Sequence, residues 1–169
     1  MSLFGQTFNT FHDLYVAQLQ DLYSAEDQLV AALPMMAEAA THPELKRGFE
    51  MHLQQTEVQR ERLDQILRSL GASPGGETCQ AMKGLVKEGN EMIAANGDDD
   101  VRDAGLIAAA QRVEHYEIAG YGTVATFAKQ LGRTEDLPLL LQSLEEEKST
   151  DEKLTTIAES VVNPDAAAA

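Results

Sequence analysis

The chain has 169 residues, and its 28 Asp and Glu residues outnumber its 13 Lys and Arg residues, for a formal net charge of -15. This length suits one domain with its own core, and the negative charge disfavours binding to nucleic-acid phosphates. The lone Cys79 excludes an internal disulfide framework and fits a reducing compartment. Because no long apolar run, leader-like segment or basic amphipathic stripe is present, we expect a soluble, cytoplasmic protein that binds neither nucleic acid nor membranes.

The first half of the chain is predicted to form an antiparallel pair of helices, because it is rich in helix-favouring Ala, Leu, Gln, Glu and Lys. The first helix should run from about Asn9 to Ala40, with Pro34 bending or locally breaking its last turns. Thr41-His42-Pro43-Glu44 is typical of a capping box with proline in the first turn, so a second helix should start there. Gly71 supplies a left-handed stop.

A crossover is predicted between this hairpin and the next. Residues 73–76, Ser-Pro-Gly-Gly, indicate a loop. A short helix should follow, with an apolar stripe that includes Met82, Leu85 and Ile93, and Gly97 should end it.

The second half of the chain predicts another long hairpin. Residues 98–100 are three aspartates, which suit the beginning of a helix, and Gly132 should stop this helix after Leu131. Thr134 is expected to cap a last helix that runs to about Val162, followed by a disordered tail at residues 166–169. Two hairpins joined by a crossover of roughly 30 residues indicate an all-α, ferritin-like four-helix bundle whose long crossover carries a short extra helix. We expect residues 1–165 to form this single domain.

Inward positions of such a bundle recur at spacings of three and four residues. At this spacing each of the four long helices is apolar at both ends and polar in its middle. Residue counts from the hairpin turns, at about 1.5 Å of rise per residue, place most of the polar exceptions at similar depth. These exceptions are Glu26 on the first helix; His52, Thr56 and Gln59 on the second; Glu114 and Glu117 on the third; and Glu147 and Asp151 on the fourth.

Five carboxylates and one imidazole in one buried layer require protons, cationic side chains or metal ions for neutralisation. No Lys or Arg falls on the inward positions. Oxygen ligands with one imidazole suit iron or manganese, and inward Glu and His side chains build two-metal sites in helical bundles. The sequence therefore predicts one or two iron or manganese ions, held by Glu26, His52, Glu114, Glu117, Glu147 and Asp151.

A plainer interpretation stays open at this point. A rotation of one or two helices would turn Glu114, Glu117, Glu147 or Asp151 toward solvent, and the consecutive charges at residues 145–148 leave the phase of the last helix ambiguous. His52 alone would more often be a hydrogen-bonded core histidine than a ligand, and only the nearby carboxylates make the two interpretations equal. In the metal hypothesis His52 is a ligand or a partner of one.

Five groups of residues carry a family resemblance: Leu22-Tyr23-Ser24-Ala25-Glu26, His52 with Thr56 and Gln59, Cys79 with Met82, Gly84 and Leu85, Val113 through Glu117 to Thr123, and Leu144 through Glu147 to Asp151. They resemble the bacterial YciF-type ferritin-like proteins, which are associated with stress responses. The resemblance spans nearly the whole chain and is most specific on the last two helices. It implies a ferritin-like bundle related to rubrerythrin and a homodimer.

The wider superfamily usually has a Glu-x-x-His pair on each of two helices, and this chain has neither. Phe49 stands three residues before His52, and Thr150 three after Glu147. We expect Glu114-x-x-Glu117 and Glu147-x-x-x-Asp151 to replace these pairs.

Two functions follow as hypotheses. One is a metal-carboxylate protein that reacts with peroxide or dioxygen. The other is a non-enzymatic structural or interaction protein with a hydrogen-bonded polar core. Whether the protein is an enzyme is left open.

Overall fold

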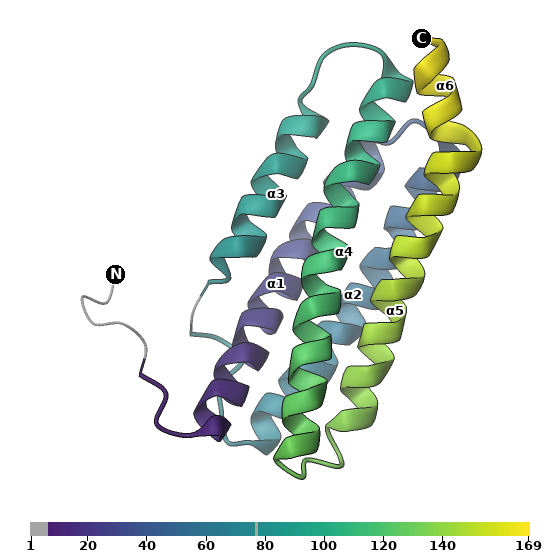
Figure 1. The fold of residues 1–169 in the computed structure, drawn as a ribbon. Helices are drawn as coiled ribbons and strands as arrows, with labels where there is room; N and C mark the ends of the chain where they lie inside the picture. Colours follow the sequence, from purple (N-terminus) through teal and green to yellow (C-terminus); the bar gives the residue numbers. More distant parts are fainter. Residues whose placement is uncertain (1–6, 77) are drawn as a thin grey trace.

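The computed structural model describes residues 7–76 and 78–169 and consists of helices joined by short turns and one crossover (Figure 1). The long helices form two antiparallel hairpins that pack side by side, and α3 lies on the crossover against α1 and α4. This confirms the predicted all-α four-helix bundle with a long crossover and an extra helix. The elements are α1 (Phe11–Ala39), α2 (Pro43–Ser69), α3 (Gln80–Ile93), α4 (Asp99–Gln130), α5 (Leu137–Ile157), a π-helical turn η1 (Ala158–Val162) and α6 (Asn163–Ala168).

Two glycines end helices as predicted. Gly71 and Gly132 adopt left-handed φ angles of 70° and 68°, a conformation that costs glycine little. The amide of the residue after each glycine donates back to a carbonyl of the last helical turn, from Ala72 to Leu67 at 2.9 Å and from Arg133 to Ala128 at 2.8 Å. These tight stops allow the neighbouring helices to fold back.

The α1–α2 turn is capped differently from the sequence expectation. His42, rather than Thr41, is the N-cap of α2, and its Nδ1 atom accepts from the Glu44 amide at 3.3 Å. Thr41 instead donates its backbone amide at 3.1 Å and its hydroxyl at 2.8 Å to buried Asp103 on α4. The turn is therefore fastened to the second hairpin, which the local sequence pattern does not reveal.

The second hairpin and the C-terminus also differ from expectation in detail. Thr134 does not cap α5, which begins after Asp136, and the Asp136 carboxylate accepts from Arg133 at 2.7 Å and from Tyr15 at 3.1 Å. Helix α1 continues through Pro34 to Ala39 without a break. Helix α6 extends to Ala168, where a disordered tail was expected from residue 166. The predicted domain boundaries include residues 1–6 and 77, which lie outside the described residues.

The bundle core has two apolar clusters separated by a polar layer. The Phe49 cluster includes Leu33, Leu45, Phe49, Leu106 and Leu154 near the α1–α2 turn. The Tyr15 cluster includes Tyr15, Leu19, Leu63, Val124 and Leu140 near the α4–α5 turn. Burial of this apolar surface at both ends holds the helices in register around the middle of the bundle. No helix within residues 7–76 and 78–169 combines the length and apolar character needed to cross a bilayer.

Candidate metal centre

The polar layer contains five of the six predicted ligands. The five side chains come from four helices, and their exposed fractions lie between 0% and 3%. The apolar clusters on either side exclude water from this layer, which strengthens electrostatic interactions within it. The five residues are Glu26 on α1, His52 on α2, Glu114 and Glu117 on α4, and Glu147 on α5.

Four of these residues bring potential ligand atoms into one small space. One ligand atom from each of His52, Glu114, Glu117 and Glu147 lies within 4.8 Å of the others. The His52 Nε2 atom is 3.2 Å from Oε1 of Glu114 and 3.8 Å from Oε2 of Glu147. Glu26 lies beside this group, and its Oε1 atom accepts a hydrogen bond from the Tyr121 hydroxyl. We refer to Glu26, His52, Glu114, Glu117 and Glu147 as the carboxylate layer.

Asp151 is not part of the carboxylate layer, so the structure differs from the sequence prediction there. Its side chain is partly exposed, accepts from Gln111 Nε2 at 3.1 Å and lies 3.5 Å from His115 Nε2. The inward face of α5 passes through Ser143, Glu147 and Thr150 before Leu154. The step after Glu147 is therefore three residues, whereas the prediction took four, and Thr150 occupies the inward position instead.

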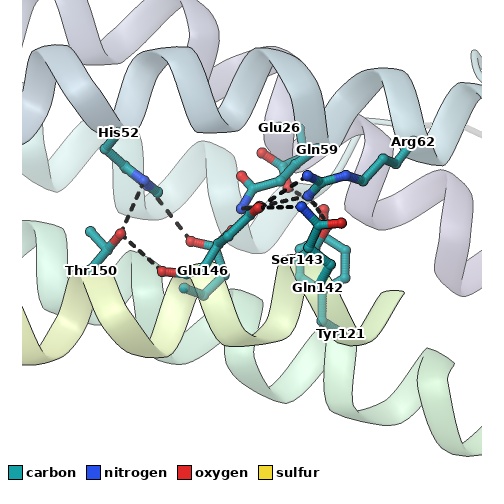
Figure 2. Close-up of polar contacts among 10 residues, drawn as sticks. Glu26, His52, Gln59, Arg62, Tyr121, Gln142, Ser143, Glu146 and Thr150 are labelled. Carbon is teal, nitrogen blue, oxygen red and sulfur yellow. Dashed lines mark hydrogen bonds and ion pairs between the residues drawn. The ribbon is translucent and has the colours of Figure 1, made fainter. Parts of the chain in front are cut away.

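Thr150 orients the imidazole of His52 (Figure 2). The Thr150 hydroxyl donates to the Glu146 carbonyl at 3.1 Å and lies 3.5 Å from His52 Nδ1. A hydroxyl group has only one proton to donate. Because Thr150 donates its proton to the Glu146 carbonyl, its oxygen can only accept a hydrogen bond from an Nδ1–H group of His52. In the neutral imidazole this assignment leaves the lone pair on Nε2, the nitrogen that faces Glu114 and Glu147, where it can bind a metal.

The nearest arginine at the edge of the layer is already paired. The Arg62 guanidinium donates to both carboxylate oxygens of Glu146, at 2.6 Å and 3.0 Å, and Gln59 Nε2 donates to the same carboxylate at 3.2 Å (Figure 2). Burial raises the pKa of Glu146, but these donors outweigh it and the pKa is lowered. The positive charge of Arg62 is thus matched by Glu146, and Arg62 does not neutralise the carboxylate layer.

Burial and mutual repulsion raise the carboxyl pKa values in the layer. Burial raises the pKa of Glu26 to about 8, against the Tyr121 hydrogen bond and the His52 charge, which lower it. Burial also raises the pKa values of Glu117 and Glu147 well above the usual range, and the neighbouring carboxylates raise them further. For His52, burial favours the neutral form, but the Glu114 carboxylate outweighs it and raises the pKa.

Many polar atoms of the layer are buried without a hydrogen-bond partner. Both carboxylate oxygens of Glu117 and of Glu147 are in this state. So are one oxygen each of Glu26 and Glu114, and His52 Nε2, which lies near Glu114 without hydrogen-bond alignment. Buried polar atoms are nearly always paired in native proteins. Unpaired acceptors that converge from four helices could therefore hold a divalent cation.

Sequence reasoning missed Thr150 and the Arg62–Glu146 pair. Alternating three- and four-residue steps from Leu140 lead either to Thr150 or to Asp151, and the structure selects Thr150. Arg62 lies three residues after the inward Gln59, so its proximity to the layer follows from helical periodicity. Its pairing with Glu146 across helices has no local signal, because it depends on the relative rotation of α2 and α5.

The comparisons with known proteins agree with the fold. The family described as "Domain of unknown function (DUF892)" matches residues 10–167. Protein YciF of Escherichia coli (strain K12) is 48% identical over 155 residues, which cover 91% of this chain and 93% of YciF. The crystal structure of this E. coli stress protein matches with a TM-score of 0.88 over 92% of this chain and 99% of that chain.

A second solved structure is similar to the same extent. YcfI from Rhodopseudomonas palustris is 44% identical, with a TM-score of 0.87 over 92% of this chain and 99% of that chain. Both the family match and the identity extend over nearly the whole chain, including the helices that carry the carboxylate layer. This chain is therefore a member of the DUF892 family and a homologue of the stress protein YciF.

Proposed function

We propose that this protein binds one or two iron or manganese ions in the carboxylate layer. The observation that supports this most is the set of buried, unpaired acceptor atoms of His52, Glu114, Glu117 and Glu147 within 4.8 Å of one another. Carboxylates supply hard oxygen ligands and His52 Nε2 a borderline nitrogen, a combination that suits iron and manganese. A divalent ion also neutralises charges whose burial is otherwise unfavourable.

The two ions would have different sets of ligands in the layer. His52, Glu114, Glu117 and Glu147 would hold one ion, since their donor atoms already converge. Glu26 has one unpaired oxygen. It lies close enough to Glu114 and Glu117 that the charge of Glu114 raises the pKa of Glu26, and the charges of Glu26 and Glu114 raise the pKa of Glu117. A second ion would use Glu26 with carboxylates shared from the first site. Asp151 is left out of the proposed ligand set because it faces His115 on the outside of α5.

Bound iron or manganese would supply the chemistry for reduction of a small oxidant such as dioxygen or peroxide. The chain's own residues would orient His52 through Thr150, and the two apolar clusters would keep bulk water away. Since the E. coli relative is described as a stress protein, we propose that this chain acts in a bacterial stress response as well. The cytoplasmic location and the homodimer stay predictions.

A structural role is the second candidate, and the raised carboxyl pKa values support it. If Glu26, Glu117 and Glu147 hold protons at neutral pH, the layer is neutral without an ion. The protein would then act through its surface, as a non-enzymatic interaction protein. A structural role has also been suggested for YcfI of R. palustris.

Calorimetric titration of the metal-free protein with Mn(II) and Fe(II) under anaerobic conditions, with elemental analysis, separates these candidates. We expect uptake of one or two ions per chain, and loss of most of it in Glu117→Gln, which keeps the side-chain shape but removes an anionic ligand. Asp151→Asn is the matched control and should bind as the parent does. Absence of uptake by the parent protein excludes the metal function and leaves the structural one.

A further inference from the structure

A small cavity adjoins the carboxylate layer between α2 and α5. It has a volume of about 30 Å³, and its wall includes His52 and Glu114, two of the proposed ligands. The remaining wall is mainly apolar and includes Phe49, Leu154 and Ile157. Gln55, Thr150 and Lys153 add polar groups at its edge, but most of the cavity surface is apolar and lies directly beside the carboxylate layer.

The absence of a side chain at Gly48 keeps this space open. Gly48 lies inside α2, where glycine is less favourable than alanine. A Cβ atom there would meet only Ile157 Cδ1, at 3.9 Å, which is an ordinary contact. A Cβ atom at this position thus causes no clash, and the further atoms of a larger side chain would extend into the cavity.

The surroundings of the cavity favour a neutral guest over a cation. Lys153 and Met51 line its outer side and are exposed. The Lys153 ammonium group disfavours the approach of metal ions from this side. The π-helical turn η1 begins directly after Ile157, and such turns occur often beside functional sites.

We propose that this cavity binds one molecule of dioxygen next to His52 and Glu114. The cavity is large enough for one small molecule, and a mainly apolar surface favours a small apolar guest over water. Hydrogen peroxide fits less well, because a mainly apolar wall replaces only part of the hydrogen bonds that its hydroxyl groups make with water. The proposal deepens the proposed function, since the gas would lie beside the metal centre, but the cavity itself belongs to the metal-free protein.

Xenon is a suitable probe because it is apolar and visible by X-ray diffraction. Crystals of the metal-free parent under xenon pressure should show a xenon atom between Gly48, Leu154 and Ile157. Gly48→Leu should remove this peak, and the smaller Gly48→Ala should lower its occupancy. The matched control is Gly84→Leu on α3, where a Cβ meets no atom within 4 Å, and it should leave the peak unchanged. Absence of xenon in the parent, or full occupancy in Gly48→Ala and Gly48→Leu, overturns the proposal.

Dissolved dioxygen tests the guest itself, because it is paramagnetic and accelerates nuclear relaxation. In the metal-free parent, the methyl groups of Leu154 and Ile157 should relax faster under dioxygen, and Gly48→Leu should lose this enhancement. Equal enhancement in both proteins contradicts the proposal. Mn(II) titration of Gly48→Leu should match the parent, which shows that the variant is folded. If the parent binds no Mn(II) while xenon still occupies the cavity, the proposed function fails and the cavity assignment stands.

Discussion

The Nε2 atom of His52 lies 3.2 Å from Oε1 of Glu114, and both side chains are buried in the middle of the bundle. A neutral imidazole with Nε2 as acceptor and an ionised carboxylate would repel one another at this distance. The pair is favourable if His52 is protonated or if a cation lies between them. The carboxylate layer is thus stabilised either by a bound metal ion or by bound protons.

Thr150→Val should weaken metal binding while it preserves the fold. Valine has the shape of threonine but cannot accept the Nδ1–H hydrogen bond of His52, so the imidazole is no longer fixed in the tautomer that presents Nε2. Loss of such a supporting contact typically lowers metal affinity by about 10-fold or more. Calorimetric Mn(II) titration measures the change. Thr156→Val, which removes an exposed hydroxyl on the same helix, should bind as the parent does, and equal affinities in all three proteins would refute the orienting role.

Arg62→Met should destabilise the protein more than Arg60→Met. The Arg62 guanidinium forms a bidentate pair with Glu146, and the two side chains are 12% and 21% exposed. Its removal leaves Glu146 near the carboxylate layer without its partner, at a cost of about 1.5–3 kcal/mol. Arg60 pairs with exposed Asp27, and such surface pairs contribute about 0–1 kcal/mol. Urea unfolding measures the free energy of unfolding of both variants. A smaller decrease in Arg62→Met than in Arg60→Met would show that water solvates the Glu146 carboxylate well enough without Arg62.

The metal-free protein should lose stability as the pH rises from about 4.5 to about 8. The pKa of Glu26 rises from 4.5 to about 8 on folding, chiefly through burial. Between these values the folded state binds more protons than the unfolded state, so the free energy of unfolding falls with increasing pH. Glu117, Glu147 and His52 have raised pKa values and act in the same direction.

Metal should reverse this pH dependence, because the ligands must be ionised to bind it. Urea unfolding across the same pH interval, with a chelator and then with saturating Mn(II), measures both trends. The pKa of Glu146 is lowered on folding, so Glu146 changes the free energy of unfolding only below about pH 4.5 and does not mask this trend. A metal-free protein that becomes more stable across this interval would contradict the clustered, protonated layer.

Replacement of Glu114 and Glu147 together by leucine should stabilise the metal-free protein and abolish metal binding. Buried charge clusters that give way to apolar packing often leave a protein unchanged or stabilise it by about 1–4 kcal/mol. Leucine at both positions would also join the Phe49 and Tyr15 clusters into one apolar core. The test is denaturant unfolding of parent and variant, free of metal and at the same pH. A variant that is clearly less stable and still takes up metal would mean that these carboxylates form a structural network.

The sequence was sufficient for the bundle and for the burial of five of the six predicted ligands in one layer. Strict spacing of inward residues on α1, α2 and α4 placed Glu26, His52, Glu114 and Glu117 in the core, as the structure has them, since each long helix keeps one face toward the core. On α5 residues 145–148 are four consecutive charged residues, so a charged side chain faces the core whichever way the helix is rotated. Helical periodicity alone therefore did not distinguish Thr150 from Asp151 as the inward residue. Contacts such as those of Asp103 with the α1–α2 turn depend on tertiary packing and have no local signature.

Anomalous X-ray scattering at the iron and manganese absorption edges tests the metal centre most directly. Crystals of the parent protein grown with Fe(II) or Mn(II) should give an anomalous peak bounded by His52, Glu114, Glu117 and Glu147, with any second peak beside Glu26. Asp98, Asp99 and Asp100 line an open surface depression near the α1–α2 turn and offer a competing acidic surface. A peak at these aspartates with none in the carboxylate layer would contradict the account.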